Sequence, residues 1–389
     1  MNDQLKQTLL EHYPTPFYTF DVAELKHRVQ FLKSHLPEEL SLCYAVKANT
    51  FISPYIAESV DRFEVCSPGE LAICTEQNIE SKKLVISGVH KSPALIEGHI
   101  LSEQRAGYYT AESIEQFSLL KRAAARADGK VNILLRLTSG NQFGMNEEDI
   151  KHIIKTEQEN EDIRICGIQY FSGTQKTSLK KYKREITHLN DFLHEIEDEL
   201  GFHCDELEYG TGFPVYYFED SKAFDEAAFL AEFAEILAAM DFECHITLEL
   251  GRSIAASCGS YFTKAVDVKT NHQQRYAIMD GGIHHIAYFG QFMAMKHPHF
   301  EIYPPREGES EEWNLCGSLC TVNDILVKGL PLADFKIGDT VIFKNAGAYC
   351  VTEGISLFLS RALPAVIILN EDGSAKQLRG AAETYKFNY

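Results

Sequence analysis

The chain has 389 residues, of which 45% are hydrophobic and 24% are charged, as in an ordinary globular protein. A net charge of −19 argues against a general nucleic-acid or membrane-surface binder, although it leaves room for a local basic pocket that holds a phosphate. No apolar run reaches the roughly 20 residues of a membrane span, no signal-peptide core opens the chain, and the ten cysteines lack paired metal-ligand spacing. We therefore expect a cytoplasmic protein with reduced cysteines, no metal site, and no membrane or nucleic-acid partner.

Strand and helix patterns alternate along the first 250 residues. Residues 14–20 alternate in apolar character like a strand, and residues 22–36 follow a helical period. Further strands are predicted at 43–46, 63–65, 83–87, 107–110, 131–137, 163–171, 206–209 and 246–249, with helical segments between most of them. About eight strands at this spacing predict an α/β fold with a closed (β/α)8 barrel of the TIM type, and an open doubly wound sheet is the alternative.

The pattern changes past Gly251. Short strand-like segments joined by turns follow, at 265–269, 274–280, 324–327, 340–344 and 365–369, and few long helical patterns accompany them. This part of the sequence predicts a second, mostly β domain.

A lysine stands at the end of the predicted strand at 43–46, in Tyr44-Ala45-Val46-Lys47-Ala48-Asn49. Taking an ammonium group out of water is costly, so a lysine in an apolar segment needs an explanation. Either Lys47 extends its amine to solvent from the strand end, or it is placed to form a Schiff base, because burial lowers the pKa of an amine and favours the neutral nucleophile.

Other predicted strand ends carry polar or glycine-rich motifs. Arg136 lies within one strand, Ser172-Gly173-Thr174-Gln175 follows another, and Tyr209-Gly210-Thr211-Gly212-Phe213 ends a third with two glycines. Glu249-Leu250-Gly251-Arg252 ends the last one. Because reactive groups collect at the carboxyl ends of barrel strands, this set together with Lys47 predicts a phosphate held by backbone amides and an arginine. The amine would lie beside it, and the carboxylate could keep a ring nitrogen protonated.

With these motifs the chain resembles the fold-type III pyridoxal-phosphate decarboxylases, typified by diaminopimelate and ornithine decarboxylases. The resemblance covers nearly the whole chain, with markers at 44–49, 63–67, 173–175, 209–213, 249–252, 316–324 and 347–349. Segments 281–285 and 317–321 resemble a branch that acts on carrier-bound amino acids or siderophore intermediates. The implied architecture is a cofactor-binding barrel at 25–255 and a β domain at 256–389, which residues 1–24 join through an N-terminal strand.

The resemblance also implies roles for single residues. Lys47 would bind pyridoxal 5'-phosphate as a Schiff base, and Glu249 would face the pyridine nitrogen, whose protonation makes the ring an electron sink. Cys320 would enter from the neighbouring subunit and help to protonate the intermediate, so the active unit would be a homodimer with shared sites. The phosphate would be held by Thr174, Gly212, Gly251, Arg252 and Tyr349, the cofactor pocket would be lined by Arg136 and Phe171, and the substrate would be contacted by Arg306 and Asp324.

Several of these residues also have an ordinary structural interpretation. Arg252 could form a surface ion pair, Glu249 could begin a helix, and Cys320 could be buried as a small hydrophobic residue. His284 and His285 could face the substrate or lie partly exposed in a turn.

The chain departs from the family pattern at four places. Phe171 replaces a histidine that stacks on the cofactor; a phenyl ring can stack but donates no proton. Thr211 and Pro214 replace loop glycines, and Pro214 removes an N–H donor. Thr321 replaces an acid, and the short segment 138–142 lacks an arginine. Loss of these distal charges argues against diaminopimelate as the substrate and weakens the case for a free diamine.

We therefore predict a pyridoxal-phosphate-dependent carboxy-lyase that removes the α-carboxylate of an amino acid, free or conjugated to a carrier protein arm or a citryl siderophore precursor. The first alternative is a racemase of the same barrel fold, which would typically place an arginine at the ring nitrogen and a tyrosine base on the second domain. The second alternative is a non-catalytic cofactor-binding protein. The predicted β domain argues against it, because such single-domain barrel proteins lack this domain.

Overall fold

The computed structural model describes residues 1–219 and 224–389. The chain divides into two compact units. Arg28–Pro214 and Phe224–Ile254 form a barrel unit, whereas Met1–His27, Val215–Ala223 and Ala255–Tyr389 form a β unit. The predicted joins at residues 24/25 and 255/256 lie within a few residues of these divisions, and the segment that starts at Val215 was not predicted to join the β unit.

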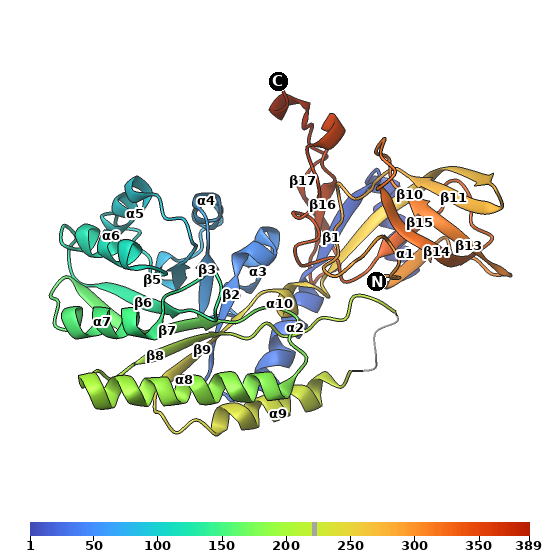
Figure 1. The fold of residues 1–389 in the computed structure, drawn as a ribbon. Coiled ribbons are helices and arrows are strands. Elements are labelled where there is room, and N and C mark those ends of the chain that lie inside the picture. Colours follow the sequence, from blue (N-terminus) through green and yellow to red (C-terminus); the bar gives the residue numbers. More distant parts are fainter. Residues whose placement is uncertain (220–223) are drawn as a thin grey trace. The chain divides into compact units, whose positions relative to one another are not determined.

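Eight parallel strands close the barrel (Figure 1). They are β2 (Ser41–Ala45), β3 (Arg62–Val65), β4 (Leu84–Ile86), β5 (Tyr108–Ala111), β6 (Val131–Leu137), β7 (Ile163–Phe171), β8 (Glu206–Gly210) and β9 (His245–Leu250). The ring closes where Ser41 of β2 pairs with Thr247 of β9. Each of the eight predicted barrel strands is found, and the closed ring excludes the open doubly wound sheet.

Helices follow the barrel strands and cover their outer side (Figure 1). They are α3 (Ser53–Ile56), α4 (Pro68–Glu76), α5 (Pro93–Ile100), α6 (Ile114–Ala124), α7 (Glu147–Glu157), α8 (Leu179–Leu200), α9 (Glu226–Ala238) and α10 (Arg252–Ala255), and α2 (Val22–His35) runs from the β unit into the barrel unit. Side chains of Ser67, Ser113 and Asp225 accept backbone N–H groups at the starts of α4, α6 and α9, as helix N-caps do. Helix α8 buries an apolar face that includes Tyr182 and Leu189.

Polar side chains fill part of the barrel interior. The strands are buried along almost their whole length, as in parallel sheets covered by helices. Within them Glu64, Gln169, Glu208 and Thr247 are at most 2% exposed. Burying so many polar groups is costly unless they bond to one another or to a ligand, so the barrel interior is a candidate functional site.

The β unit is built on a nine-stranded sheet, ordered β14-β13-β11-β10-β1-β16-β17, with β15 pairing with β10 and β12. Its strands are β1 (Phe17–Asp21), β10 (Gly259–Asn271), β11 (Gln274–Met279), β12 (Phe300–Tyr303), β13 (Ser310–Cys316), β14 (Ile325–Ala333), β15 (Thr340–Phe343), β16 (Ala365–Leu369) and β17 (Ala375–Arg379), and α1 (Asp3–His12) precedes them. Strand β1 lies between antiparallel β10 and parallel β16, so the N-terminal strand is part of this sheet. Strands β12, β13 and β17 were not predicted.

No helix within residues 1–219 or 224–389 combines the length and apolar character that crossing a bilayer requires.

Candidate active site

Lys47 follows the end of β2 on a short 3-10 turn, Val46–Ala48. Its Nζ donates to Glu64 Oε2 and lies 3.6 Å from Glu249 Oε1. The side chain keeps 38% of its surface exposed. The amine is therefore held by carboxylates at the carboxyl end of the barrel, but it is not buried as deeply as the pKa argument from the sequence assumed.

The two carboxylates beside Lys47 differ in their charge. Glu64 lies in β3, one residue before its end, and Glu249 lies in β9, and both side chains are largely buried. Burial and the negative charge of Glu64 raise the pKa of Glu249 to about 7. Burial also opposes ionisation of Glu64, but the charge of Lys47 outweighs it and lowers the pKa of Glu64 below its ordinary value. Glu64 is thus the permanent anion, and Glu249 can gain or lose a proton near neutral pH.

Cys66 completes the surroundings of the lysine amine. Its Sγ donates to Glu64 Oε1 over 3.1 Å and lies 3.5 Å from Lys47 Nζ. Burial and the charge of Glu64 raise the pKa of the Cys66 thiol far above its ordinary value, so it stays protonated. Neither Glu64 nor Cys66 was predicted as a site residue, although an acid inside the apolar strand at 63–65 is a signal of the same kind as Lys47.

The loops after β7 and β8 form a tight cradle of glycines. Gly212 has a φ of 59°, and a Cβ atom at this position would lie 2.0 Å from the carbonyl oxygen of Gly173. The backbone N–H of Lys176 donates to the Gly212 carbonyl over 2.9 Å and closes the contact between the loops. Since only glycine fits at residue 212, the predicted phosphate loop has the backbone shape that lets N–H groups approach an anion.

The other predicted phosphate ligands of the barrel unit lie at adjacent strand ends. Thr174 is on the loop after β7, next to Gly173. Gly251 follows β9, and Arg252 begins α10 with 8% of its surface exposed. Because Arg252 is buried, the surface ion pair considered for it is excluded. The helix-start role considered for Glu249 is also excluded, because Glu249 lies inside strand β9.

A buried ion pair lies beside the cradle. Lys176 Nζ contacts Glu185 Oε2 at 2.9 Å, Ser172 Oγ at 3.1 Å and the Tyr209 hydroxyl at 3.1 Å. Burial lowers the pKa of Lys176 to about 8 even though Glu185 favours the charged form. The four side chains join the loop after β7, helix α8 and strand β8, so they fix the backbone that forms the cradle. The pairing of Lys176 with Glu185 was not predicted from the sequence.

Phe171 ends β7 opposite Gly210 of β8. A Cβ atom at Gly210 would lie 2.5 Å from the phenyl ring, so the ring rests on the Gly210 backbone next to the cradle. This placement is compatible with a ring that stacks on a flat ligand.

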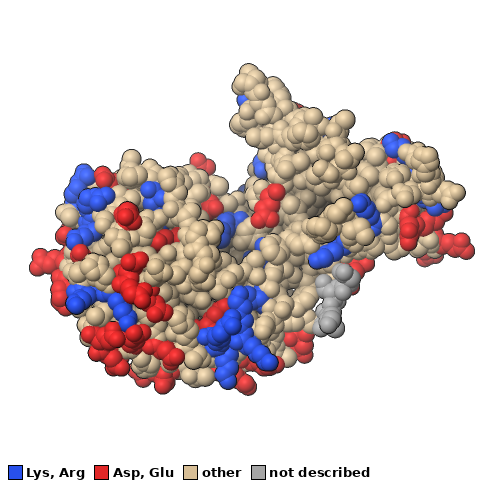
Figure 2. All heavy atoms as spheres, viewed as in Figure 1, with Lys and Arg blue, Asp and Glu red and all other residues tan. Residues whose placement is uncertain are grey.

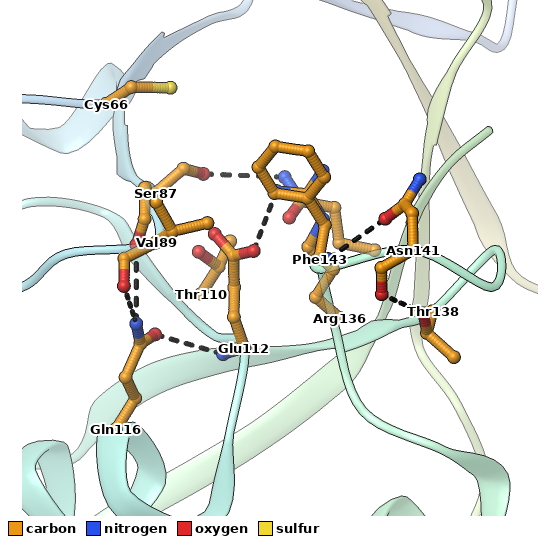
Figure 3. Close-up of polar contacts among 12 residues, drawn as sticks. Cys66, Ser87, Val89, Thr110, Glu112, Gln116, Arg136, Thr138, Asn141 and Phe143 are labelled. Atoms are coloured by element: carbon orange, nitrogen blue, oxygen red, sulfur yellow. Dashed lines mark hydrogen bonds and ion pairs between the residues drawn. The ribbon is translucent and has the colours of Figure 1, made fainter. Parts of the chain in front are cut away.

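Arg136 projects from β6 into a polar network (Figure 3). Its Nη1 lies 3.1 Å from Glu112 Oε2, and its guanidinium lies 4.9 Å from the centre of the Phe143 ring. Gln116 accepts the Glu112 backbone N–H over 3.0 Å and also accepts from Lys91 Nζ over 3.0 Å. The positive charge of Arg136 favours the ionised forms of Glu64 and Glu249, so it adds to the low pKa of Glu64 and opposes the rise in the pKa of Glu249. Arg136 thus acts in the same electrostatic environment as Lys47.

Glu208 lies deeper in the barrel, with no exposed surface. Its Oε1 accepts from Gln169 Nε2 over 2.6 Å, and Gln169 is 3.5 Å from Ser87 Oγ. Burial and the charge of Glu249 raise the pKa of Glu208 to about 8, so this carboxyl is mostly protonated at neutral pH.

The remaining predicted residues belong to the β unit. Cys320 is exposed, which excludes its alternative as a buried hydrophobic residue. Asp324 is 3% exposed and accepts the backbone N–H groups of Leu319 and Ile283 over 2.7 and 2.9 Å, so it shapes the turn that carries Cys320. Arg306 pairs with Asp339 at 2.5 Å, and Tyr349 adopts a φ of 64°.

His284 and His285 are 2% and 4% exposed, so the partly exposed turn considered for them is wrong. His285 Nε2 contacts the Ala362 carbonyl at 2.8 Å. Burial, chiefly, lowers the pKa of His284 to about 3 and of His285 to about 4, so both rings are neutral at physiological pH.

Over the described ranges, 1–219 and 224–389, no group of three or more histidine, cysteine, aspartate or glutamate side chains is placed to hold a metal ion.

Comparison with known proteins agrees with this geometry. The family model described as "Pyridoxal-dependent decarboxylase, pyridoxal binding domain" matches residues 22–256. The L-glutamyl-[BtrI acyl-carrier protein] decarboxylase of Niallia circulans is 26% identical, over 97% of this chain and 94% of that protein. The 2-[(L-alanin-3-ylcarbamoyl)methyl]-2-hydroxybutanedioate decarboxylase of Staphylococcus aureus is 24% identical, over 94% and 97%. The crystal structure of diaminopimelate decarboxylase from Helicobacter pylori with L-lysine has the same fold, with a TM-score of 0.86 at 22% identity over 98% of both chains.

Proposed function

The chain belongs to the family of pyridoxal-dependent decarboxylases, and from this premise we propose how its residues act and on what kind of substrate. Its cofactor is pyridoxal 5'-phosphate, and its reaction is the decarboxylation of an amino acid. The racemase alternative is not favoured, because the relatives that match over almost the whole chain are decarboxylases. The same matches extend through the β unit, which a non-catalytic single-domain binder would lack.

The barrel residues fit the cofactor for two reasons. Only glycine fits at residue 212, where the two cradle loops approach each other closely. The amine of Lys47 lies between the carboxylates of Glu64 and Glu249 at the same end of the barrel. We propose that Gly212, Gly251, Arg252 and Thr174 hold the phosphate, with Tyr349 from the β unit. When bound, the cofactor supplies an electron sink for the electrons left by loss of CO2. Lys47 would hold it covalently, Phe171 would stack on its ring, and Arg136 would line the pocket.

Three groups would then control protons around the reaction. Glu249, whose pKa is about 7, would share a proton with the ring nitrogen. Glu64, which stays ionised, would hold the amine of Lys47 and its protons through Oε2. Cys320 would deliver the proton that replaces the lost carboxylate. Arg306 and Asp324 would orient the substrate, Asp324 by holding the turn of Cys320.

This proposal depends most on the position of the Lys47 amine between Glu64 and Glu249. Reduction with borohydride followed by peptide mapping should label Lys47, and CO2 release from a panel of amino acids and conjugates should be lost in Lys47→Ala. If protein that contains the cofactor is labelled elsewhere, or if only α-proton exchange is observed, the proposal fails.

We propose that the amino acid is presented as a conjugate. Two relatives act on such substrates by their names, one on a glutamyl acyl-carrier protein and one on a carbamoylmethyl hydroxybutanedioate. In addition, Thr321 and the short segment 138–142 lack the distal charges that a free diamino acid would need.

We also propose that the protein is a cytoplasmic homodimer with shared sites and binds neither membranes nor nucleic acid. Several large apolar side chains of the β unit support the dimer because they are strongly exposed. They include Phe292 at 70%, Met293 at 67% and Met295 at 64%. The net charge of −19 supports the absence of a nucleic-acid partner.

A further inference from the structure

Helix α8 begins with an unusual concentration of positive charge. Lys180, Lys181, Lys183 and Arg184 lie in its first two turns, and no acid occupies the first turn. The start of a helix carries the positive end of the helix dipole, so cations in the first turn are unfavourable where an acid would stabilise the helix. Helix α7 follows the usual rule and begins with Glu147, Glu148 and Asp149.

These cations are available to a partner. Lys180, Lys183 and Arg184 are exposed, and within the described chain only Lys181 of the four lies within ion-pair distance of an acid, at 3.8 Å from Glu185. Figure 2 shows blue side chains gathered over the part of the barrel unit where α8 runs in Figure 1. Lys180 and Arg184 are like charges four residues apart on one helix face, an arrangement that is unfavourable for the helix itself. In a chain with a net charge of −19, such a gathering of cations stands out from the rest of the surface.

A groove of about 450 Å³ adjoins the cluster, between α8 and α9. Lys180 and Lys183 lie on its α8 side, and its apolar part includes Leu179, Ile186, Ile236 and Met240. Its α9 side carries Glu232 and Glu235. The groove thus offers apolar area for a side chain of a partner and opposite charges on its two sides, which would fix the partner's orientation.

The cluster lies at the reactive end of the barrel. Strand β7 ends at Phe171, the cradle loop follows, and α8 starts at Leu179, so the helix begins at the same carboxyl end as Lys47 and Gly212. The buried Lys176–Glu185 pair ties this start of α8 to the cradle loop.

We propose that the start of α8 and the α8–α9 groove dock an acidic carrier protein that brings the amino-acid substrate to the barrel. This inference rests on the proposed function and narrows the conjugate to one that is attached to a protein. An isolated exposed ion pair contributes little, but several cations on one face raise the rate of encounter with an acidic surface. A small anionic conjugate would not need cations spread over two turns of an exposed helix.

The test compares a charge-reversal variant, Lys180→Glu/Lys183→Glu/Arg184→Glu, with the matched control Arg122→Glu/Lys130→Glu/Lys155→Glu. The control changes the net charge equally at exposed positions elsewhere on the barrel unit. The probes are an acyl carrier protein charged with L-glutamate and the small analogue glutamyl-pantetheine, used with the full chain loaded with cofactor. We expect the first variant to raise KM for the carrier substrate by about tenfold or more, with kcat and the kinetics of the small analogue unchanged. The control should behave as wild type, and added salt should raise the wild-type KM.

Binding of the uncharged carrier protein, followed by fluorescence anisotropy, tests docking apart from catalysis. Docking is overturned if wild type does not bind the carrier, if the control weakens binding as much as the α8 variant, or if the α8 variant changes the oligomeric state instead. The proposed function survives these results as long as any amino acid or small conjugate releases CO2. Carrier binding without CO2 release from any substrate would instead overturn the proposed function.

Discussion

Three buried glutamates of the barrel differ in protonation because their neighbours differ. Glu64 bonds to Lys47 and stays ionised, whereas Glu249 is farther from the amine and feels the charge of Glu64. Glu208 bonds to the neutral amide of Gln169 and is repelled by Glu249, so its pKa rises to about 8. One fixed anion, one group that titrates near pH 7 and one neutral acid thus lie within a single barrel interior.

Replacement of Glu208 by glutamine should stabilise the fold at high pH. A folded-state pKa near 8, raised from 4.5, means that Glu208 favours folding while protonated, below pH 4.5, and that this contribution is lost as pH rises toward 8. Glutamine mimics the protonated acid and keeps an acceptor for Gln169. Urea unfolding should give equal free energies at about pH 4.5 and a gain of up to about 5 kcal/mol for Glu208→Gln at about pH 8. The exposed control Glu161→Gln should show no such trend, and a pH-independent difference would contradict the assigned pKa.

Single residues of the site could be predicted where one position carries an intrinsic signal. A lysine in an apolar segment and glycines at strand ends are visible in one sequence, and the structure places Lys47, Gly173 and Gly212 at one end of the barrel. Glu64 and Lys176 were missed because their importance depends on partners 17 and 9 residues away, Lys47 and Glu185. Such pairs become evident only when strand pairing and helix packing are known.

At the scale of elements, the Lys176–Glu185 pair joins three segments that form the cradle. Both side chains are nearly inaccessible, with 2% and 6% exposed. Removing one partner of a buried pair leaves an uncompensated charge and costs about 3–5 kcal/mol. Because the Lys176 backbone also bonds to Gly212, this loss should be transmitted to the loop that we propose binds the phosphate.

Replacement of Lys176 by methionine should therefore weaken cofactor binding through the phosphate. We expect the affinity for pyridoxal 5'-phosphate to fall by about tenfold or more, and the affinity for pyridoxal, which lacks the phosphate, to change little. Equilibrium dialysis with both ligands measures the ratio.

Two further variants separate this effect from general destabilisation. Lys181→Met removes a partly exposed lysine 3.8 Å from Glu185 and should leave both affinities unchanged. Lys176→Met/Glu185→Gln removes the unpaired charge and should recover stability but not the preference for the phosphorylated ligand. If the double variant also restores that preference, the loop is not held by the lysine.

Elements were predicted well where burial makes the pattern simple. The barrel strands are mostly buried and carry apolar residues at most positions, so their places along the chain can be predicted from composition. The strands that were missed are different: β17 (Ala375–Arg379) is exposed at four of five residues, and β13 begins with Ser310, Glu311 and Glu312. Their strand structure comes from pairing with β16 and with β11 and β14, which an isolated segment does not reveal.

At the scale of the whole molecule, exposed apolar side chains are concentrated in the β unit. They lie mainly at residues 289–295, 355–359 and 385–389. Exposed apolar side chains in such numbers are typical of an interaction surface, and the proposed symmetric dimer would cover them. Cys320 is exposed in the same unit, which is compatible with its proposed role in the site of a neighbouring subunit.

Mixing inactive subunits tests whether the proposed dimer shares its sites. Lys47→Ala and Cys320→Ala protomers should each be nearly inactive, because one lacks the lysine of the barrel and the other the thiol of the β unit. After the two variants are unfolded and refolded together in equal amounts, half of the dimers are mixed. Each mixed dimer holds one intact site, so about a quarter of wild-type activity should return.

Mixing Lys47→Ala with Glu249→Ala should restore no activity, because both residues belong to the same barrel. Sedimentation should show dimers throughout. If no activity returns in the first mixture, or if it returns equally in the second, the sites are not shared in this way.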